Sequence, residues 1–114
     1  MKAIDHHAAQ CALDKFCDKD VYLHLETTNG AYASHRDESF LNAGAYIRNA
    51  KIRFIRGKIT GNGPYRVGLK LEQGWVYAEG LTDWEIDDKD RLLLAGHNSE
   101  GKLAVALQLS EQPF

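Results

Sequence analysis

The chain has 114 residues, of which 44% are apolar and 26% are charged, and its formal net charge is −2. These values predict one ordinary globular domain, 1–114, that is large enough to bury a core of its own. No apolar run is long enough to cross a bilayer and the N-terminus lacks the apolar region of a signal peptide, so we expect a cytoplasmic protein with no membrane contact.

The first predicted element is a helix over residues 5–17. Asp5 is a good N-cap residue, and apolar residues follow it at the spacing of one helical face: Ala9, Ala12, Leu13 and Phe16. Cys11 and Cys17 lie on or just past this helix, so they are not expected to form a disulfide. Reduced thiols agree with a cytoplasmic location.

Residues 20–110 alternate between apolar and polar side chains, which predicts antiparallel strands. Asn29-Gly30 is the strongest hairpin signal, and Arg56-Gly57 and Gln73-Gly74 predict two more tight turns. Pro64 cannot lie inside a central strand, so Gly61–Pro64 is a predicted loop. The predicted fold is mainly β, either a small antiparallel meander barrel or a curled β-sandwich, with one N-terminal helix.

The predicted hairpin around Gln73-Gly74 has two unlike faces. A two-residue loop places Lys70 opposite Tyr77 and Gly68 opposite Glu79. The apolar face then contains Val67, Leu69, Leu71, Val76 and Ala78, and the other face contains Arg66, Gly68, Lys70, Trp75, Tyr77 and Glu79. Gly68 leaves a dent that suits the close approach of a ligand or of backbone. The alternative is an ordinary solvated face with cross-strand pairs.

The last predicted hairpin is apolar on both faces. One face contains Leu92, Leu94, Val105 and Leu107, and the other contains Leu93, Ala95, Ala104 and Ala106. Strands of this kind are buried on both sides. The second face is therefore expected to be covered by the helix, by a curled part of the sheet, or by a second subunit in a homodimer.

A first candidate site lies on the predicted hairpin around Asn29-Gly30. A two-residue loop there places His24 opposite His35, with Glu26 on the same face. Two histidines and a carboxylate form a known zinc ligand set, and the same groups suit acid–base catalysis. The alternative is an ordinary polar surface, since no metal-binding spacing motif accompanies these residues.

A second candidate site follows from the uneven distribution of charge. No Asp or Glu occurs between Ser39 and Leu71, whereas nine acids and three bases follow from Glu72 onward. Basic and aromatic residues of this region form a candidate site for an anionic group: Arg48, Arg53, Tyr65, Arg66, Lys70, Trp75 and Tyr77. The alternative is pairing of opposite charges across the sheet. Nucleic acid is not an expected partner, because the second half is acidic and the pI is about 6.2.

Five segments that span essentially the whole chain carry a family resemblance: DVYLHLETTNGAYASH, NAGAYIRNAKIR, GNGPYRVGLK, GWVYAEGLT and LAVALQLS. The chain closely resembles the YojF-like proteins, a family of small uncharacterised proteins from bacilli and their relatives. The resemblance implies a compact, mostly β, cytoplasmic protein. Members tend to be encoded beside a deacetylase that resembles those of thiol-cofactor biosynthesis, which implies this enzyme as a candidate partner. The family has no established catalytic residues, so the resemblance assigns none here.

Two functions are therefore expected. The first is a non-catalytic module without a cofactor that binds a partner protein, such as the deacetylase, or a small anionic ligand. The second is a metal-dependent or acid–base enzyme that uses His24, Glu26 and His35. The sequence leaves open whether the chain forms a homodimer.

Overall fold

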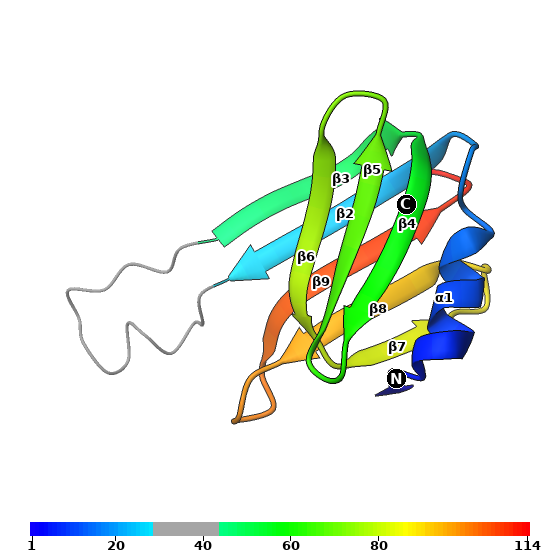
Figure 1. Cartoon of the computed structure of the whole chain (residues 1–114). Helices are drawn as coiled ribbons and strands as arrows, with labels where there is room; N and C mark the ends of the chain where they lie inside the picture. Colours follow the sequence, from blue (N-terminus) through cyan, green and yellow to red (C-terminus); the bar gives the residue numbers. More distant parts are fainter. Residues whose placement is uncertain (29–43) are drawn as a thin grey trace.

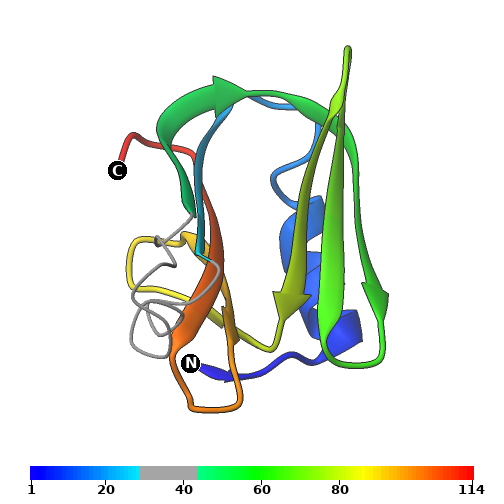
Figure 2. The same ribbon diagram turned by 90° about the vertical axis from the view of Figure 1, so that its left-hand side faces the viewer.

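The computed structural model describes residues 1–28 and 44–114 as two β-sheets that pack face to face, with one helix beside them (Figure 1). The larger sheet has six strands in the order β1-β7-β8-β9-β2-β3, and the smaller has three in the order β4-β5-β6. Figure 2 shows the two layers edge-on, with the chain crossing between them after β3. In the part of the chain that is described, the sheets do not close into a barrel, so the curled β-sandwich is the correct one of the two predicted folds.

The elements have the following bounds. The larger sheet is made of β1 (Lys2–Ala3), β2 (Val21–Thr28), β3 (Gly44–Ile52), β7 (Asp83–Ile86), β8 (Leu92–His97) and β9 (Leu103–Ser110). The smaller sheet is made of β4 (Phe54–Gly61), β5 (Tyr65–Leu71) and β6 (Trp75–Leu81), and the helix α1 is His6–Asp14. All strand pairs are antiparallel.

The helix begins at the predicted cap and ends earlier than predicted. The Asp5 carboxylate accepts a hydrogen bond from the Ala8 N–H at 3.0 Å, which satisfies one of the free donors of the first turn. After Asp14 the chain continues through a tight turn, in which the N–H of Cys17 donates to the Asp14 carbonyl. Phe16 lies in this turn and is buried. All residues of the predicted apolar stripe are therefore in the core, although the last one lies outside the helix.

The core lies between the two sheets and under α1. Its largest fully buried side chains come from both sheets and from the helix: Leu13, Leu23, Phe54, Ile59, Leu69, Leu81, Leu92, Leu94, Leu107 and Leu109. Alternation along each strand sends these residues inward and their polar neighbours outward. Removal of this apolar surface from water is the main term that holds the two layers together.

The predicted turn at Arg56-Gly57 is wrong, because Gly57 lies within the single continuous strand β4 and pairs with Leu69. A Cβ atom at Gly57 would lie 3.0 Å from Cδ2 of Leu13 and 3.1 Å from Cε2 of Phe54. The glycine therefore serves the close packing of α1 on β4. From the local sequence alone, a glycine that forms a turn cannot be distinguished from a glycine that allows close packing within a strand.

The outer edge of β4 is covered by side chains of the helix. The Gln10 amide nitrogen donates to the Gly57 carbonyl at 2.9 Å, and the Gln10 amide oxygen accepts from the Ile59 N–H at 2.8 Å. The Nε2 atom of His6 forms a further hydrogen bond with the Ile59 carbonyl. The Gln10 amide thus pairs with β4 in the way that a neighbouring strand would.

The hairpin of β5 and β6 has the predicted faces but a different register. Lys70 pairs with Trp75 and Gly68 pairs with Tyr77, two residues away from the predicted pairing. The connection is three residues long and ends at Gly74, whose φ of 90° suits glycine in a turn of this class. Because side chains alternate with a period of two, a shift of two residues changes the pairs and leaves the faces unchanged.

The last hairpin, β8 and β9, is buried on both faces at its centre. Leu92, Leu94 and Leu107 lie in the core, and on the opposite face Ala95 and Ala106 are 2% and 5% exposed. The predicted two-sided burial is confirmed for these positions. A homodimer contact at this face stays a prediction.

Among the described residues, no helix has the length and apolar character that crossing a bilayer requires.

Candidate functional site

The outward face of the three-stranded sheet carries most of the predicted anion site. Alternation along three adjacent strands places nine residues on it, and we call this surface the basic face: Arg56, Lys58, Thr60, Arg66, Gly68, Lys70, Trp75, Tyr77 and Glu79. The strand pairing sets Arg56 beside Lys70 and Lys58 beside Gly68. The sheet therefore gathers side chains from both sides of the Gly61–Pro64 loop onto one surface.

Positive charge exceeds negative charge on the basic face. Its one carboxylate, Glu79, accepts from Nε of Arg66 at 3.2 Å. Within the described residues, no ion pair is formed by the other three cations: Arg56, Lys58 and Lys70. All three are exposed. Clustered cations without acidic neighbours create a positive potential that attracts anions.

Two aromatic rings hold the flanking cations in place. Trp75 and Tyr77 stack with their ring centres 5.5 Å apart and their planes 8° from parallel. The Arg66 guanidinium lies 4.1 Å from the Tyr77 ring centre, and the Lys70 ammonium lies 5.4 Å from the Trp75 ring centre. Cations at these distances are attracted by the π face. The two rings thus already have cation partners of the chain's own, and their main effect is to orient Arg66 and Lys70.

A shallow cavity of about 140 Å³ lies in the middle of the basic face, lined by Arg56, Lys58, Thr60, Arg66, Gly68, Trp75 and Tyr77. The Tyr77 ring covers Gly68 so closely that a Cβ atom there would lie 2.9 Å from Cε1 of Tyr77. The predicted dent at Gly68 is therefore filled by a ring of the chain itself. The remaining volume is below that of a typical small-molecule pocket and suits one carboxylate or phosphate group between cations.

The structure places two other predicted site residues away from the basic face. The ring of Tyr65, at the start of β5, lies 5.8 Å from the ring of His6 on the helix side. Arg53 lies at the corner between β3 and β4, where it donates to the Asp18 carbonyl at 2.6 Å and lies 3.8 Å from the Asp20 carboxylate. These contacts join the corner to the turn after α1.

Arg48 lies on the larger sheet, beside His24. An Arg48 guanidinium nitrogen and Nδ1 of His24 are 3.2 Å apart, a hydrogen bond in which the arginine donates. His24 is 4% exposed. Burial, followed by the Arg48 charge, lowers the pKa of His24, while Glu26 opposes this shift. His24 is therefore neutral near pH 7, and its Nδ1 lone pair is used by Arg48.

The pairing of β2 differs from the one that placed His24 opposite His35. One edge of β2 pairs with β3 and the other with β9, so Glu26 has Tyr46 on one side and Ala106 on the other. Asn29-Gly30 and His35 lie outside the described residues. Within residues 1–28 and 44–114, no group of three or more His, Cys, Asp or Glu side chains is arranged to hold a metal ion. The site of His24, Glu26 and His35 stays a prediction.

Arg56 and Lys58 were not predicted as members of the candidate site. The turn predicted at Arg56-Gly57 excluded β4 from the face. The alternation of Arg56, Lys58 and Thr60 with Gly57 and Ile59 is a two-residue period and was the available signal.

Comparisons with known proteins agree on one family. A family model described as "Protein of unknown function (DUF1806)" matches residues 3–114. The uncharacterized protein YojF of Bacillus subtilis (strain 168) is 55% identical over 114 residues, which covers 100% of this chain and 98% of the relative. The crystal structure of Bacillus subtilis YojF matches with a TM-score of 0.84 and 52% identity, over 99% of this chain and 95% of that one. These matches confirm the resemblance drawn from the sequence.

Proposed function

The chain belongs to the DUF1806 family of proteins of unknown function, and on this premise we propose that it is a non-catalytic binding module of the cytoplasm. Its basic face holds acidic groups of a partner protein. A small anionic ligand on the same face is the alternative occupant.

One observation carries this proposal, namely the cation excess of the basic face. Arg56, Lys58 and Lys70 have no carboxylate partner among the described residues, while Arg66 shares the single carboxylate of the face. An incoming carboxylate therefore gains charge-assisted hydrogen bonds without breaking an ion pair between these three residues and any described residue. A cavity of this small size also suits a group on the surface of a protein partner better than it suits a deeply enclosed small molecule.

The family resemblance supplies a candidate partner, the deacetylase that resembles those of thiol-cofactor biosynthesis. The proposal predicts a complex in which acidic residues of this enzyme lie on the basic face. Attraction between exposed charges weakens as salt screens it, so the affinity is expected to fall between low and physiological ionic strength.

Charge reversal tests the surface. The double variant Lys58→Glu/Lys70→Glu is expected to weaken the complex at least about 10-fold at low salt, as measured by titration calorimetry, because two favourable charge pairs become repulsive. Lys15→Glu/Lys89→Glu is the matched control, since it reverses the same number of charges at two exposed residues outside the basic face. Equal affinities for the double variant and for the control would refute the basic face as the binding surface.

The small-ligand alternative has its own measurement. Pyrophosphate and citrate are expected to raise the melting temperature of the wild-type chain in a saturable way and to have a weaker effect on the double variant. No complex with the deacetylase, together with no stabilisation by either anion, would contradict the proposed function as a whole.

A further inference from the structure

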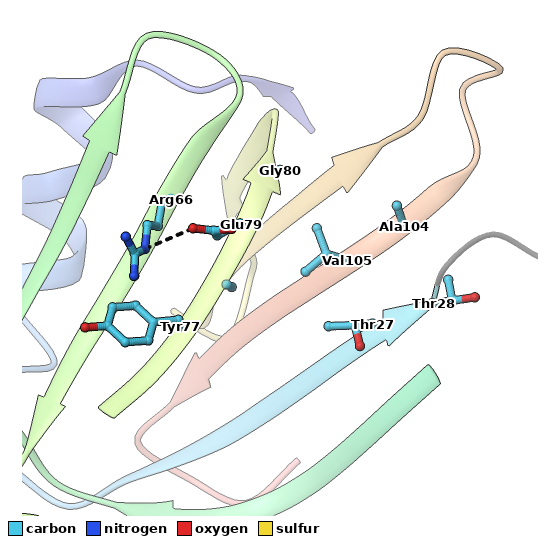
Figure 3. Close-up of a pocket in the computed structure, with 9 residues that line it drawn as sticks. Thr27, Thr28, Arg66, Tyr77, Glu79, Gly80, Ala104 and Val105 are labelled. Carbon is cyan, nitrogen blue, oxygen red and sulfur yellow. Dashed lines mark ion pairs between the residues drawn. The ribbon is translucent and has the colours of Figure 1, made fainter. Parts of the chain in front are cut away.

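A cleft of about 590 Å³ lies beside the basic face, between the two sheets (Figure 3). It is lined by Thr27, Thr28, Arg66, Tyr77, Ala78, Glu79, Gly80, Ala104 and Val105. Tyr77–Gly80 are four consecutive residues of β6. Side chains of a strand alternate between two faces, so four consecutive residues share one cavity only when that cavity runs along the edge of the strand.

The backbone of β6 presents hydrogen-bonding groups to this cleft. The N–H of Leu71 donates to the Gly74 carbonyl, which makes the pair nearest the turn a hydrogen-bonded one. Hydrogen-bonded and non-hydrogen-bonded pairs alternate along an antiparallel ladder. The pairs of Trp75 with Lys70 and of Tyr77 with Gly68 are therefore non-hydrogen-bonded, and the N–H and C=O groups of Trp75 and Tyr77 point away from β5.

Within the described residues, β5 is the only strand that pairs with β6. The pairing with β5 is regular from Trp75 to Ala78, and then a bulge follows, with Gly80 at a φ of 78°. A Cβ atom at Gly96 of β8 would lie 2.0 Å from the Gly80 carbonyl, so the two sheets meet closely at that point. The cleft is thus closed at the Gly80 end, and along Tyr77–Gly80 it is lined by a strand edge that no strand of residues 1–28 and 44–114 pairs with.

We propose that the free edge of β6 receives an extended segment of the partner protein, in which acidic and apolar residues alternate. The added strand would lie about 4.8 Å from β6 and continue the smaller sheet by backbone hydrogen bonds. Its outward side chains would extend the basic face next to Trp75 and Tyr77. Its inward side chains would enter the cleft.

The residues around the edge set the chemistry of that segment. Outward positions lie beside Trp75 and Tyr77, whose rings carry the Lys70 and Arg66 cations, so acidic side chains fit there by charge. Inward positions face Ala78 and Val105, which suit medium-sized aliphatic side chains. This inference rests on the proposed function and specifies the form in which the partner binds.

Four synthetic six-residue peptides with blocked ends test the edge. The first alternates glutamate with valine. The second and third have the same sequence with every second backbone nitrogen methylated, one in each of the two possible frames, and the fourth alternates lysine with valine. Methylation removes the donors of one edge of the peptide and keeps its charge. The readout is a titration followed in amide spectra of the labelled full chain, with hydrogen exchange measured at Trp75 and Tyr77.

The glutamate–valine peptide is expected to bind and to slow exchange at the Trp75 and Tyr77 amides at least about 10-fold, since both amides gain acceptors. One methylated frame and the lysine–valine peptide are expected to bind at least about 10-fold more weakly. Equal binding of both methylated frames, without slowed exchange, would overturn the edge inference while the basic face stands.

Absence of glutamate–valine binding would also overturn it. If pyrophosphate or the deacetylase still binds, only the edge inference is lost, and if neither binds, the proposed function is lost as well. A dimer in sedimentation, with both amides already protected, would assign the edge to a second copy of the chain and refute the proposal.

Discussion

The two edges of the three-stranded sheet are treated in opposite ways. At β4, the Gln10 amide accepts from the Ile59 N–H and donates to the Gly57 carbonyl. The Leu13 side chain packs against Gly57. At β6, the described part of the chain supplies no pairing strand, and a cleft of about 590 Å³ lies alongside. One edge is thus occupied by the chain's own helix, while no described strand pairs with the other.

This difference suggests that the β4 edge contributes to stability and the β6 edge to binding. An unpaired strand edge is a template for pairing with another chain, and proteins usually cover it. Here the helix covers only β4, and the cations that have no acidic partner among the described residues lie on the same sheet as the β6 edge. We therefore expect substitutions at the β4 edge to change the free energy of unfolding, and substitutions at the β6 edge to change binding.

The largest effect is expected from Leu13→Ala. Leu13 is fully buried between α1 and β4, and its truncation leaves a cavity under the helix, so the free energy of unfolding should fall by about 3 kcal/mol. Urea denaturation measures this. Val76→Ala, beside the open edge, should cost about 1 kcal/mol because Val76 is only half-buried. Equal costs would break the comparison.

Gln10→Ala should come next, with a loss of about 1–2 kcal/mol, because the Gly57 carbonyl and the Ile59 N–H both lose a partner. Gln10→Glu is the graded control, since it keeps an acceptor for Ile59 and removes the donor to Gly57. Hydrogen exchange at the Ile59 amide should accelerate in the alanine variant and much less in the glutamate variant. Unchanged exchange in both would show that the helix does not cover this edge.

Alanine substitutions at Gly68 and Gly74 should also have different effects, one on binding and the other on stability. Gly68→Ala should change the free energy of unfolding by less than about 1 kcal/mol, since the exposed Tyr77 ring can move away from the new Cβ. It should alter the near-ultraviolet circular dichroism of the Trp75–Tyr77 stack and weaken anion binding. Gly74→Ala should do the reverse, with a loss of about 1 kcal/mol from its φ of 90° and an intact stack. Identical signatures would contradict the role given to Gly68.

The smallest effect on stability is expected from Glu79→Gln. The Arg66–Glu79 ion pair is exposed, so its loss should change the free energy of unfolding by no more than about 0.5 kcal/mol. The substitution frees Arg66 and should raise the affinity for pyrophosphate severalfold, as measured by titration calorimetry. A lower affinity would mean that Glu79 helps to hold the anion site together.

The part of the candidate site that was predicted correctly consists of residues that lie close together in the chain. Arg66, Lys70, Trp75 and Tyr77 lie on two adjacent strands, and their common face was predicted because alternation fixes it even when the register is wrong by two. The contribution of Arg56 and Lys58 was missed because Gly57 has the local signature of a turn. The pairing of Gly57 with Leu69 shows that β4 continues, and the packing of Leu13 against that glycine gives the reason for a glycine there.

Arg48 and Arg53 were predicted at the same site, and the structure places both of them elsewhere. They belong to the same acid-free stretch as Arg66, yet the chain crosses from the larger to the smaller sheet between β3 and β4, at Arg53. Arg48 therefore stays on the larger sheet beside His24, and Arg53 binds the turn after α1. Proximity in sequence does not predict proximity in space when a strand changes sheets.

The sequence alone determined which side of each strand is apolar, where the helix begins, the mainly β class and the family. These properties depend on the alternation of side chains along a strand, on the Asp5 cap and on local composition. Each of these is set by residues that are close together in the chain. The tertiary structure decided how the strands divide between two sheets, which edge the helix covers and which cations share a face. These properties depend on contacts between residues far apart in the chain, such as Gln10 with Ile59, and short-range patterns carry no record of them.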